Sequence, residues 1–454
     1  MQLREMLWNT DSFQTASSLV QSIVSSGCPA KLRIIDDQNQ SSIVIPKQYQ
    51  RMFARALDLS VHLPSFYDDR VVPASSNDTS LYTYDDRKNE DCKGYYSFLL
   101  EIAYMGEHFC GWQTQPNNKE RPSVQQTLED WLQPMFEPSR RTKTKKNNRE
   151  RIETPDSNNK KKKRIIQEPR VNIRVAGRTD AGVHAIGQIC RFRTWSKGGG
   201  QSTFQWNDVP TTMTSTGVDD DDAVSNSVNE LKSPSEKLQE YINQHPLSGT
   251  SFRCLRVTPV SSKFHPTFGA SCRAYLYLID ASPIEELLKN RSCVQGTLPS
   301  IFVKRFVQKL NSILQPLEDQ ELDYLAMSYG QVKTQSTLCH LMIARAFLVE
   351  FNLEETDLKY GSERRRQSAL CIQLVGNRFL RRMVRILVST ALREALSMEN
   401  IPATTSNCDR GKDGYGDDDV ASQRLVNVLL SKDRTQSAPP APPQGLIFAS
   451  AIFE

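Results

Sequence analysis

The alternation of apolar and polar residues predicts strands along most of the chain, with helices between them. Positions that alternate with period two favour half-buried strands, whereas apolar positions three and four apart favour helices. The predicted strands lie at 97–104, 171–177, 186–192, 251–260, 271–280, 338–350, 368–375 and 445–453. The predicted helices lie at 123–136, with Ser123 as N-cap, at 299–314 and at 379–397. This order favours an α+β fold with a mixed, largely antiparallel sheet and helices on one face.

Three segments interrupt this pattern, at about 138–169, 198–234 and 402–420. Each is polar and poor in aromatic residues, so we interpret all three as loop expansions inside a fold. A chain of 454 residues suits two domains of ordinary size. We therefore predict an N-terminal extension and linker of unknown role (1–94), a first lobe (95–270) and a second lobe (271–454).

Composition narrows the class of protein. No run of about 18 apolar residues is present, which disfavours a membrane span. The ten cysteines are scattered singly without a C-x-x-C pair, as expected in a reducing compartment and not in a disulfide framework or a cysteine zinc site. The N-terminus lacks the layout of a secretory signal. We expect an intracellular protein of the cytoplasm or nucleus, with an organelle not excluded.

The positive charge is concentrated in one segment. The whole chain has a net charge of +5, but residues 140–164 hold twelve Lys/Arg and three Asp/Glu, so the remainder is negative. Three interpretations of this basic insert stay open: RNA phosphate binding, a nuclear localisation signal around 160–164, or a solvated expansion.

A single carboxylate, Asp180, stands in the stretch GRTDAGVHA at 177–185. One interpretation is an ordinary turn, in which Asp and Gly are common. A second is a metal pair with His184, four residues on. Gly182 and the β-branched Val183 oppose the helix that such a pair would need, and no further ligand cluster is evident, so we expect no metal.

The third interpretation comes from a resemblance. Residues 177–185 resemble the catalytic-aspartate motif of the tRNA pseudouridine synthase A family, in its bacterial-type form. Other stretches resemble the family's remaining motifs, in the family's order. They are Tyr104-Met105-Gly106 with 109–115, Ser123-Val124-Gln125, Phe264-His265 with 273–277, then 376–385 and 445–448. The resemblance spans about 97–453 and omits the extension and the inserts.

The resemblance implies an isomerase whose chemistry needs one acid and no cofactor. Uridine becomes pseudouridine when its N-glycosidic bond breaks, the base turns, and C5 joins the same sugar carbon. Asp180 would either attack C1′ or take a proton from C2′, and the two routes stay open. Arg385 would favour the ionised carboxylate, while Tyr275 would stack on the flipped uracil and assist proton removal from C5.

The resemblance also implies tRNA as the substrate, with the anticodon stem-loop (38–40 region) as target. It implies two related α/β lobes that flank a central RNA-binding cleft, and a homodimer. Arg178 would help to displace the target base. The other candidates for RNA binding or for shaping the RNA groove are Trp112, Gln113, Gln115, His184, Arg273, Phe379, Arg381 and Arg382.

The chain departs from the family pattern at Pro266-Thr267, where the family usually has Ala-Arg, which bears on substrate choice more than on reaction type. Two rival functions remain. A catalytically silent RNA-binding protein or tRNA chaperone could keep the fold, although Asp180, Tyr275 and Arg385 are all present. A nucleoside hydrolase would need a water-activating partner, and the sequence offers no candidate.

Overall fold

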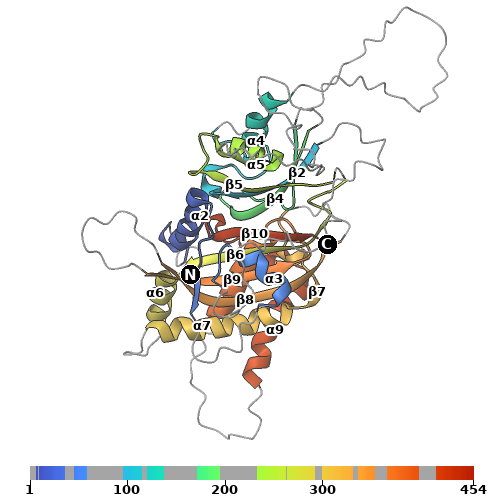
Figure 1. Ribbon diagram of the computed structural model, residues 1–454. Helices are drawn as coiled ribbons and strands as arrows, with labels where there is room; N and C mark the ends of the chain where they lie inside the picture. Colours follow the sequence, from blue (N-terminus) through green and yellow to red (C-terminus); the bar gives the residue numbers. More distant parts are fainter. Residues whose placement is uncertain are drawn as a thin grey trace, which may run out of the picture.

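The computed structural model of the protein is shown in Figure 1. It describes residues 7–8, 10–35, 45–58, 96–114, 120–136, 171–194, 233–261, 263–291, 299–330, 336–352, 366–397 and 416–453. Among the helices in these ranges, none is long and apolar enough to cross a membrane.

Ten strands form one sheet in the described part of the chain. They are β1 (Arg33–Ile35), β2 (Tyr96–Tyr104), β3 (Val171–Val175), β4 (His184–Thr194), β5 (Phe252–Pro259), β6 (Ala270–Asp280), β7 (Gln320–Asp323), β8 (Leu338–Asn352), β9 (Arg366–Gly376) and β10 (Leu446–Phe453). The order across the sheet is β1-β8-β9-β6-β10-β4-β2-β5, with β3 beside β4 and β7 beside β8. Only β4 and β10 run parallel among these paired strands, because the last strand inserts between the two halves of the sheet.

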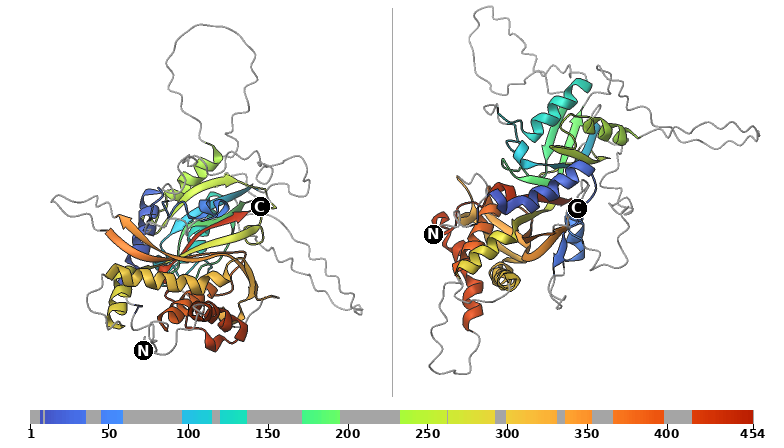
Figure 2. Two further views of the ribbon diagram at one scale, coloured as in Figure 1. Left: turned by 90° about the horizontal axis from the view of Figure 1, so that it is seen from below. Right: turned by 90° about the vertical axis from the view of Figure 1, so that its left-hand side faces the viewer.

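Eight α-helices accompany the sheet in the described ranges. They are α2 (Gln14–Ser26), α3 (Lys47–Phe53), α4 (Val124–Leu132), α5 (Pro234–Asn243), α6 (Ala281–Arg291), α7 (Pro299–Leu314), α8 (Met383–Ser397) and α9 (Gly416–Ser431). Figures 1 and 2 show α4 and α5 at one end of the molecule and α6, α7 and α9 at the other. The expected α+β class with a mixed, largely antiparallel sheet is therefore confirmed.

Alternation along the strands separates two hydrophobic cores, one on each face of the sheet. On β6, Tyr275 and Tyr277 enter the core that contains α4 to α9, whereas Ala274 and Leu276 enter the other. That second core is closed by α2 and α3, both from the N-terminal extension. Helices thus lie on both faces, because the second face is also apolar and needs a cover. The sequence of the extension did not predict where it would pack.

Helix α2 is held at both ends by the main body. The carboxylate of Asp280 accepts hydrogen bonds from the backbone N–H groups of Gln14 (3.0 Å) and Thr15 (3.1 Å). At the other end, Nε of Arg253 donates to the carbonyl of Val24 at 2.5 Å. An acid at the N-terminus and a cation at the C-terminus both complement the helix dipole. Residues 10–26 are therefore an integral layer of the fold.

Three predicted boundaries differ from the structure. The helix expected at 379–397 begins at Met383, because 377–382 form a loop in which Arg382 has a left-handed φ of 59°. The insert expected at 402–420 overlaps α9, which begins at Gly416, and the one at 198–234 gives way to α5, whose N-cap is Ser233. The polar first turns of α9 and α5 hid these helix starts. The linker from 65 to 94, the basic insert and the rest of the other inserts lie outside the described residues.

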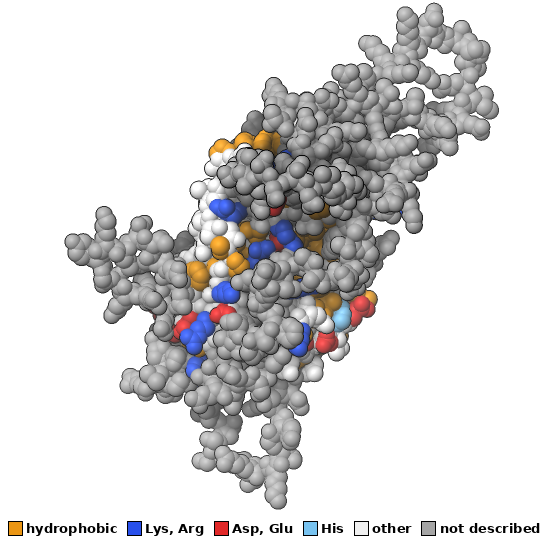
Figure 3. Space-filling view, in the orientation of Figure 1, with side chains coloured by type: hydrophobic (Ala, Val, Ile, Leu, Met, Phe, Trp, Pro, Cys, Tyr) orange, Lys and Arg blue, Asp and Glu red, His pale blue; other side chains and the backbone are white. Residues whose placement is uncertain are grey.

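Cationic groups are not confined to the basic insert. Figure 3 shows Lys and Arg side chains beside hydrophobic ones across the centre of the described surface in this orientation. The folded body thus exposes positive charge of its own, outside residues 140–164.

Candidate active site

Asp180 lies in the loop that joins β3 to β4. Gly182 has a φ of 80°, and Val183 N–H donates to the carbonyl of Asp180 at 3.2 Å, which closes the turn. The hydroxyl of Thr179 is hydrogen-bonded to that of Tyr104 at 2.8 Å, so Thr179 points inward. The carboxylate of the next residue, Asp180, remains 35% exposed. The loop therefore presents one carboxylate from a rigid backbone.

A second turn contacts this loop from outside. Gly111 has a φ of 109°, and a side chain there would bring its Cβ to 3.0 Å from the carbonyl oxygen of Thr179. The neighbouring Trp112 N–H donates to that same oxygen at 3.1 Å. The indole of Trp112 is only 1% exposed and packs on Tyr104, so its side chain shapes the loop and is inaccessible to RNA in this conformation.

His184 supports the loop from beneath. Its Nδ1 accepts a hydrogen bond from the backbone N–H of Gly106 at 3.2 Å. Burial lowers the pKa of His184 to about 4, so the imidazole is neutral at pH 7. This hydrogen bond fixes the position of the loop, and the burial of His184 keeps it from the direct contact with RNA for which it was a candidate.

Arg385 meets Asp180 from helix α8. Its Nη1 lies 3.3 Å from Oδ2 of Asp180, and its Nε donates to the carbonyl of Ala441 at 2.6 Å. Burial lowers the pKa of Arg385, whereas the negative charge of Asp180 raises it. The guanidinium remains charged at pH 7. The two bonds use different edges of the guanidinium fork, so they fix both its position and its orientation.

A second arginine faces the same carboxylate. Nε of Arg382 lies 3.7 Å from Oδ2 of Asp180, and the guanidinium stacks over the ring of Tyr329 at 4.0 Å from its centroid. The left-handed backbone at Arg382 directs this side chain toward Asp180 from just before α8. The predicted helix would have placed it differently. Nothing in the sequence predicted that Arg382 would stack on Tyr329.

Tyr275 comes from β6, on the far side of β10. Phe448 of β10 pairs with both Tyr275 and Ala185, so β10 sets β6 beside the strand that leaves the Asp180 loop. The ring of Tyr275 makes edge contacts with Phe379 and Phe448, at centroid distances of 5.0 and 5.2 Å. Burial raises the pKa of Tyr275 to about 12, so its hydroxyl is protonated at pH 7.

Gly177 leaves room for the tyrosine hydroxyl. A Cβ at Gly177 would lie 3.5 Å from the hydroxyl of Tyr275 and 3.3 Å from the ring of Phe448. The glycine that opens the motif thus permits the loop to pass close over the tyrosine. The three residues of the predicted catalytic trio, Asp180, Tyr275 and Arg385, are assembled at one place.

The remaining predicted residues divide by exposure. Arg178, Gln113 and Arg381 are exposed, and Gln115 lies outside the described residues. Arg178 forms no hydrogen bond or ion pair with the described part of the chain that would hold its side chain away from a ligand. Arg273 is different, because its guanidinium donates to backbone carbonyls of Ala176 (3.2 Å), Ala270 (3.3 Å) and Asn377 (2.6 Å). These hydrogen bonds connect the Asp180 loop to the segment that leads to Arg385.

The proline-rich segment 438–445 was missed by the sequence reasoning. Pro443 lies against Gly182, where a Cβ would come within 2.8 Å of its ring. Pro442 accepts a hydrogen bond from the Tyr277 hydroxyl at 2.9 Å, and Ala441 holds Arg385. The four prolines of this segment have restricted φ angles, and they were the feature of the sequence that could have indicated a fixed backbone here.

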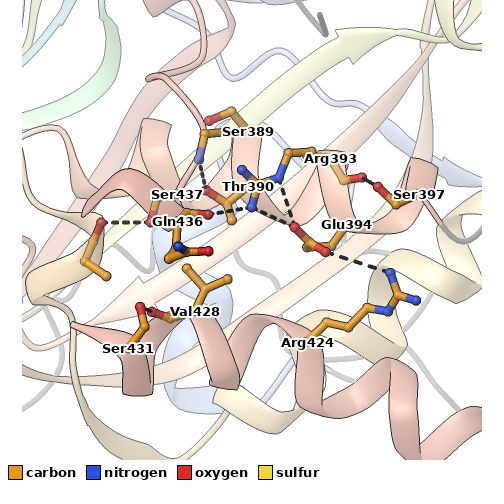
Figure 4. A network of polar contacts seen from close by, with 12 residues as sticks. Ser389, Thr390, Arg393, Glu394, Ser397, Arg424, Val428, Ser431, Gln436 and Ser437 are labelled. Carbon is orange, nitrogen blue, oxygen red and sulfur yellow. Dashed lines mark hydrogen bonds and ion pairs between the residues drawn. The ribbon is translucent and has the colours of Figure 1, made fainter. Parts of the chain in front are cut away.

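Helix α8 holds the start of this segment through the polar network in Figure 4. The hydroxyl of Thr390 accepts from the backbone N–H of Ala438 at 3.0 Å, and Nη2 of Arg393 donates to the carbonyl of Gln436 at 2.6 Å. Glu394 pairs with Arg393 at 2.7 Å. One helix therefore carries Arg385 and also positions the backbone that orients it.

The site contains no metal centre among the residues that the structure describes, since no group of three His, Cys, Asp or Glu side chains could hold an ion there. What it offers is one accessible carboxylate, two guanidinium groups and a buried, protonated phenol. Such a set can donate electrons or accept a proton at one carboxylate oxygen, with its charge stabilised by the arginines.

The chain is similar to known tRNA pseudouridine synthases. Residues 102–216 match the family model of tRNA pseudouridine synthase, a range that includes the Asp180 loop. The chain is 23% identical over 357 residues to tRNA pseudouridine synthase A of Francisella tularensis subsp. novicida, covering 79% of this chain and 94% of that protein. It is 24% identical over 360 residues to the protein of the same description in Leptospira biflexa serovar Patoc, with the same coverage. These matches confirm the resemblance of the chain to the tRNA pseudouridine synthase A family.

Proposed function

We propose that this protein isomerises uridine to pseudouridine in tRNA, with Asp180 as the essential carboxylate. The family match and the descriptions of its relatives support an isomerase that acts on tRNA uridine. The observation that carries the assignment of residues is the 3.3 Å contact between Asp180 and Arg385, which are 205 positions apart, beside the buried Tyr275.

The chemistry follows from the charges in the site. Asp180 acts as an anion, and the guanidinium groups of Arg385 and Arg382 stabilise that charge. The carboxylate either attacks C1′ of the target nucleoside or removes a proton from C2′, and in both routes the glycosidic bond breaks and uracil turns within the pocket. C5 then bonds to C1′, and its proton must leave. Tyr275 lies close enough to Asp180 for the two groups to interact electrostatically, so it stacks on the base and assists that proton transfer.

Several residues would contact RNA around this centre. A uridine within a stem must leave the base stack before Asp180 can reach its sugar. Arg178 is exposed beside Asp180 and takes the role of displacing the base. Arg381 and Gln113 are also exposed, and we assign them to the flanking RNA backbone. Arg382, Phe379 and Arg273 shape the pocket.

We assign the cleft to the boundary between two lobes, 95–270 and 271–454. Helices α4 and α5 cover the first set of strands and α6 to α9 the second, while Asp180 and Arg385 come from opposite sides of that division. The anticodon stem-loop, in the 38–40 region, is the target that we assign. We also propose, from the family resemblance, that the protein forms a homodimer in which one tRNA would contact both copies.

The test uses unmodified tRNA transcripts and three proteins: wild type, Asp180→Asn and Asp130→Asn. Asp130 is an exposed acid on α4 and serves as the matched control. We expect pseudouridine from wild type and Asp130→Asn, mapped to the anticodon stem-loop, and none from Asp180→Asn. Tight tRNA binding without product from wild type would instead identify a silent RNA-binding protein. Light scattering of the free protein and of the tRNA complex measures the assembly.

A further inference from the structure

An aromatic side chain stands out from the surface on the loop between β5 and β6. Phe268 is 85% exposed, more than any other large hydrophobic residue described. Its ring stacks on the imidazole of His265, with centroids 4.5 Å apart and planes inclined by 30°. A stacked pair of rings with one open face is the geometry on which an unpaired base can stack.

Positive charge surrounds this pair. Nη1 of Arg174 lies 2.8 Å from Nε2 of His265, and Arg191 donates to the carbonyl of Phe264 at 2.6 Å. Arg174 and Arg191 are paired across β3 and β4, so two like charges lie side by side. Burial, together with Arg193 and Arg174, lowers the pKa of Arg191 to about 10. Burial and the arginines also lower the pKa of His265, so the imidazole is neutral at pH 7 and accepts from Arg174. An anion would relieve this repulsion.

The loop is fastened to both sides of the active site. Thr267 Oγ1 donates to the carbonyl of Val175, the last residue of β3, at 2.7 Å. Arg273 then links Ala270 in this loop to Ala176, which enters the Asp180 loop, and to Asn377, which leads to Arg385. The loop that carries the exposed ring is therefore bonded to the backbone on both sides of the active site.

We propose that Phe268, His265 and Arg174 form an RNA-binding platform, in which Phe268 stacks on an unpaired base of the substrate tRNA and Arg174 contacts a neighbouring phosphate. The proposal rests on the proposed function and adds a specific contact to it. A protein partner is disfavoured, because a single exposed ring among arginines is not the contiguous apolar patch that protein interfaces use. Base stacking and phosphate contact are together how single-stranded nucleic acid is held without sequence preference.

The test measures tRNA binding and turnover separately. Phe268→Ala should raise the Kd and KM for tRNA about tenfold while kcat changes by less than about twofold, and Phe268→Trp should retain wild-type values. Arg174→Ala should weaken binding and reduce the slope of log Kd against log salt by about one, whereas Arg174→Lys should keep the slope. The matched controls are Leu430→Ala and Arg305→Ala, which remove an exposed apolar side chain and an exposed cation from α9 and α7.

Binding is also measured in the Asp180→Asn background, so that the result does not depend on catalysis. If wild type forms no pseudouridine but Phe268→Ala still weakens tRNA binding in that background, the platform stands and the proposed function fails. Unchanged tRNA affinity in both Phe268→Ala and Arg174→Ala, or equal losses in Leu430→Ala and Arg305→Ala, would overturn the platform. Thermal melts of each variant show whether a loss comes from unfolding.

Discussion

Replacement of Arg385 by lysine tests the central geometry most directly, because it keeps the positive charge and removes the fork. The guanidinium bonds Asp180 at 3.3 Å and the Ala441 carbonyl at 2.6 Å from different nitrogens. One ammonium cannot occupy both positions. A hydrogen bond to a charged group contributes about 1.5–3 kcal/mol, so loss of one predicts a fall in kcat of roughly 10- to 150-fold.

The Coulombic attraction sets an upper bound on this effect. Two unit charges 3.3 Å apart attract by roughly 5 kcal/mol at an effective dielectric constant of about 20. The carboxylate of Asp180 is 35% exposed, so water screens part of that attraction, and Arg382 remains at 3.7 Å. Arg385→Lys retains most of the charge effect. We expect Arg385→Ala to lose more activity than Arg385→Lys but to stay within this bound.

The assay follows release of tritium from C5 of labelled uridine in tRNA, under single-turnover conditions with enzyme in excess. Arg345→Lys is the control, because Arg345 on β8 pairs with Glu318 at 2.6 Å and not with Asp180. The enzyme concentration that gives half of the maximal rate should change by less than about threefold in both variants. If Arg385→Lys keeps more than about a third of the wild-type rate, or if Arg345→Lys loses as much, then the contact between Arg385 and Asp180 is not what drives catalysis.

Four further predictions concern the residues around this contact. Tyr275→Phe keeps the ring between Phe379 and Phe448, so tRNA affinity should persist while tritium release slows by about tenfold or more; equal rates would exclude the hydroxyl from the reaction. Burial lowers the pKa of His184 to about 4, so between pH 6.5 and about 4 the unfolded chain binds more protons at this residue than the folded chain does. The contribution of His184 to the free energy of unfolding is therefore complete above pH 6.5 and declines by about 3 kcal/mol toward pH 4. Urea titrations of His184→Gln should show a smaller decline than wild type over that window. Gly106→Ala would place a Cβ 2.3 Å from the carbonyl carbon of Val183, so we expect a Tm lower by several degrees and loss of activity, and wild-type melting would contradict the packing. Asp280→Ala removes the acceptor for two N–H groups of α2 and should lower the free energy of unfolding by about 1–2 kcal/mol with kcat unchanged, as measured by urea titration and tritium release.

The sequence was most reliable where the signal was local. Ser123 accepts a hydrogen bond from Gln126 N–H at 3.0 Å, as expected of an N-cap, and the predicted strands at 97–104 and 271–280 match β2 and β6. The loop at 177–185 also has the turn that its glycines suggest. Periodicity and turn chemistry depend on neighbours within a few positions, so they can be recognised without knowledge of the tertiary fold.

Local patterns failed where a residue's environment comes from distant parts of the chain. Trp112 could have faced RNA or the core, and its burial against Tyr104 was decided by how the two turns pack. Arg382 continued a helical pattern, yet its backbone is left-handed because its side chain reaches between Tyr329 and Asp180. Helix α2 of the extension, which the sequence did not predict, is held on the second face by Asp280 and Arg253.

The sequence by itself determined eight of the ten described strands, three of the eight described α-helices, the motif loop and, through the family resemblance, which three side chains to examine. The tertiary structure decided that Asp180 and Arg385 meet, that Tyr275 is buried beside them, and that 438–445 orients the arginine. The physical reason is the insertion of β10 between β4 and β6, which runs parallel to one and antiparallel to the other. Such a register is set by the packing of both cores together, and no single stretch of residues encodes it.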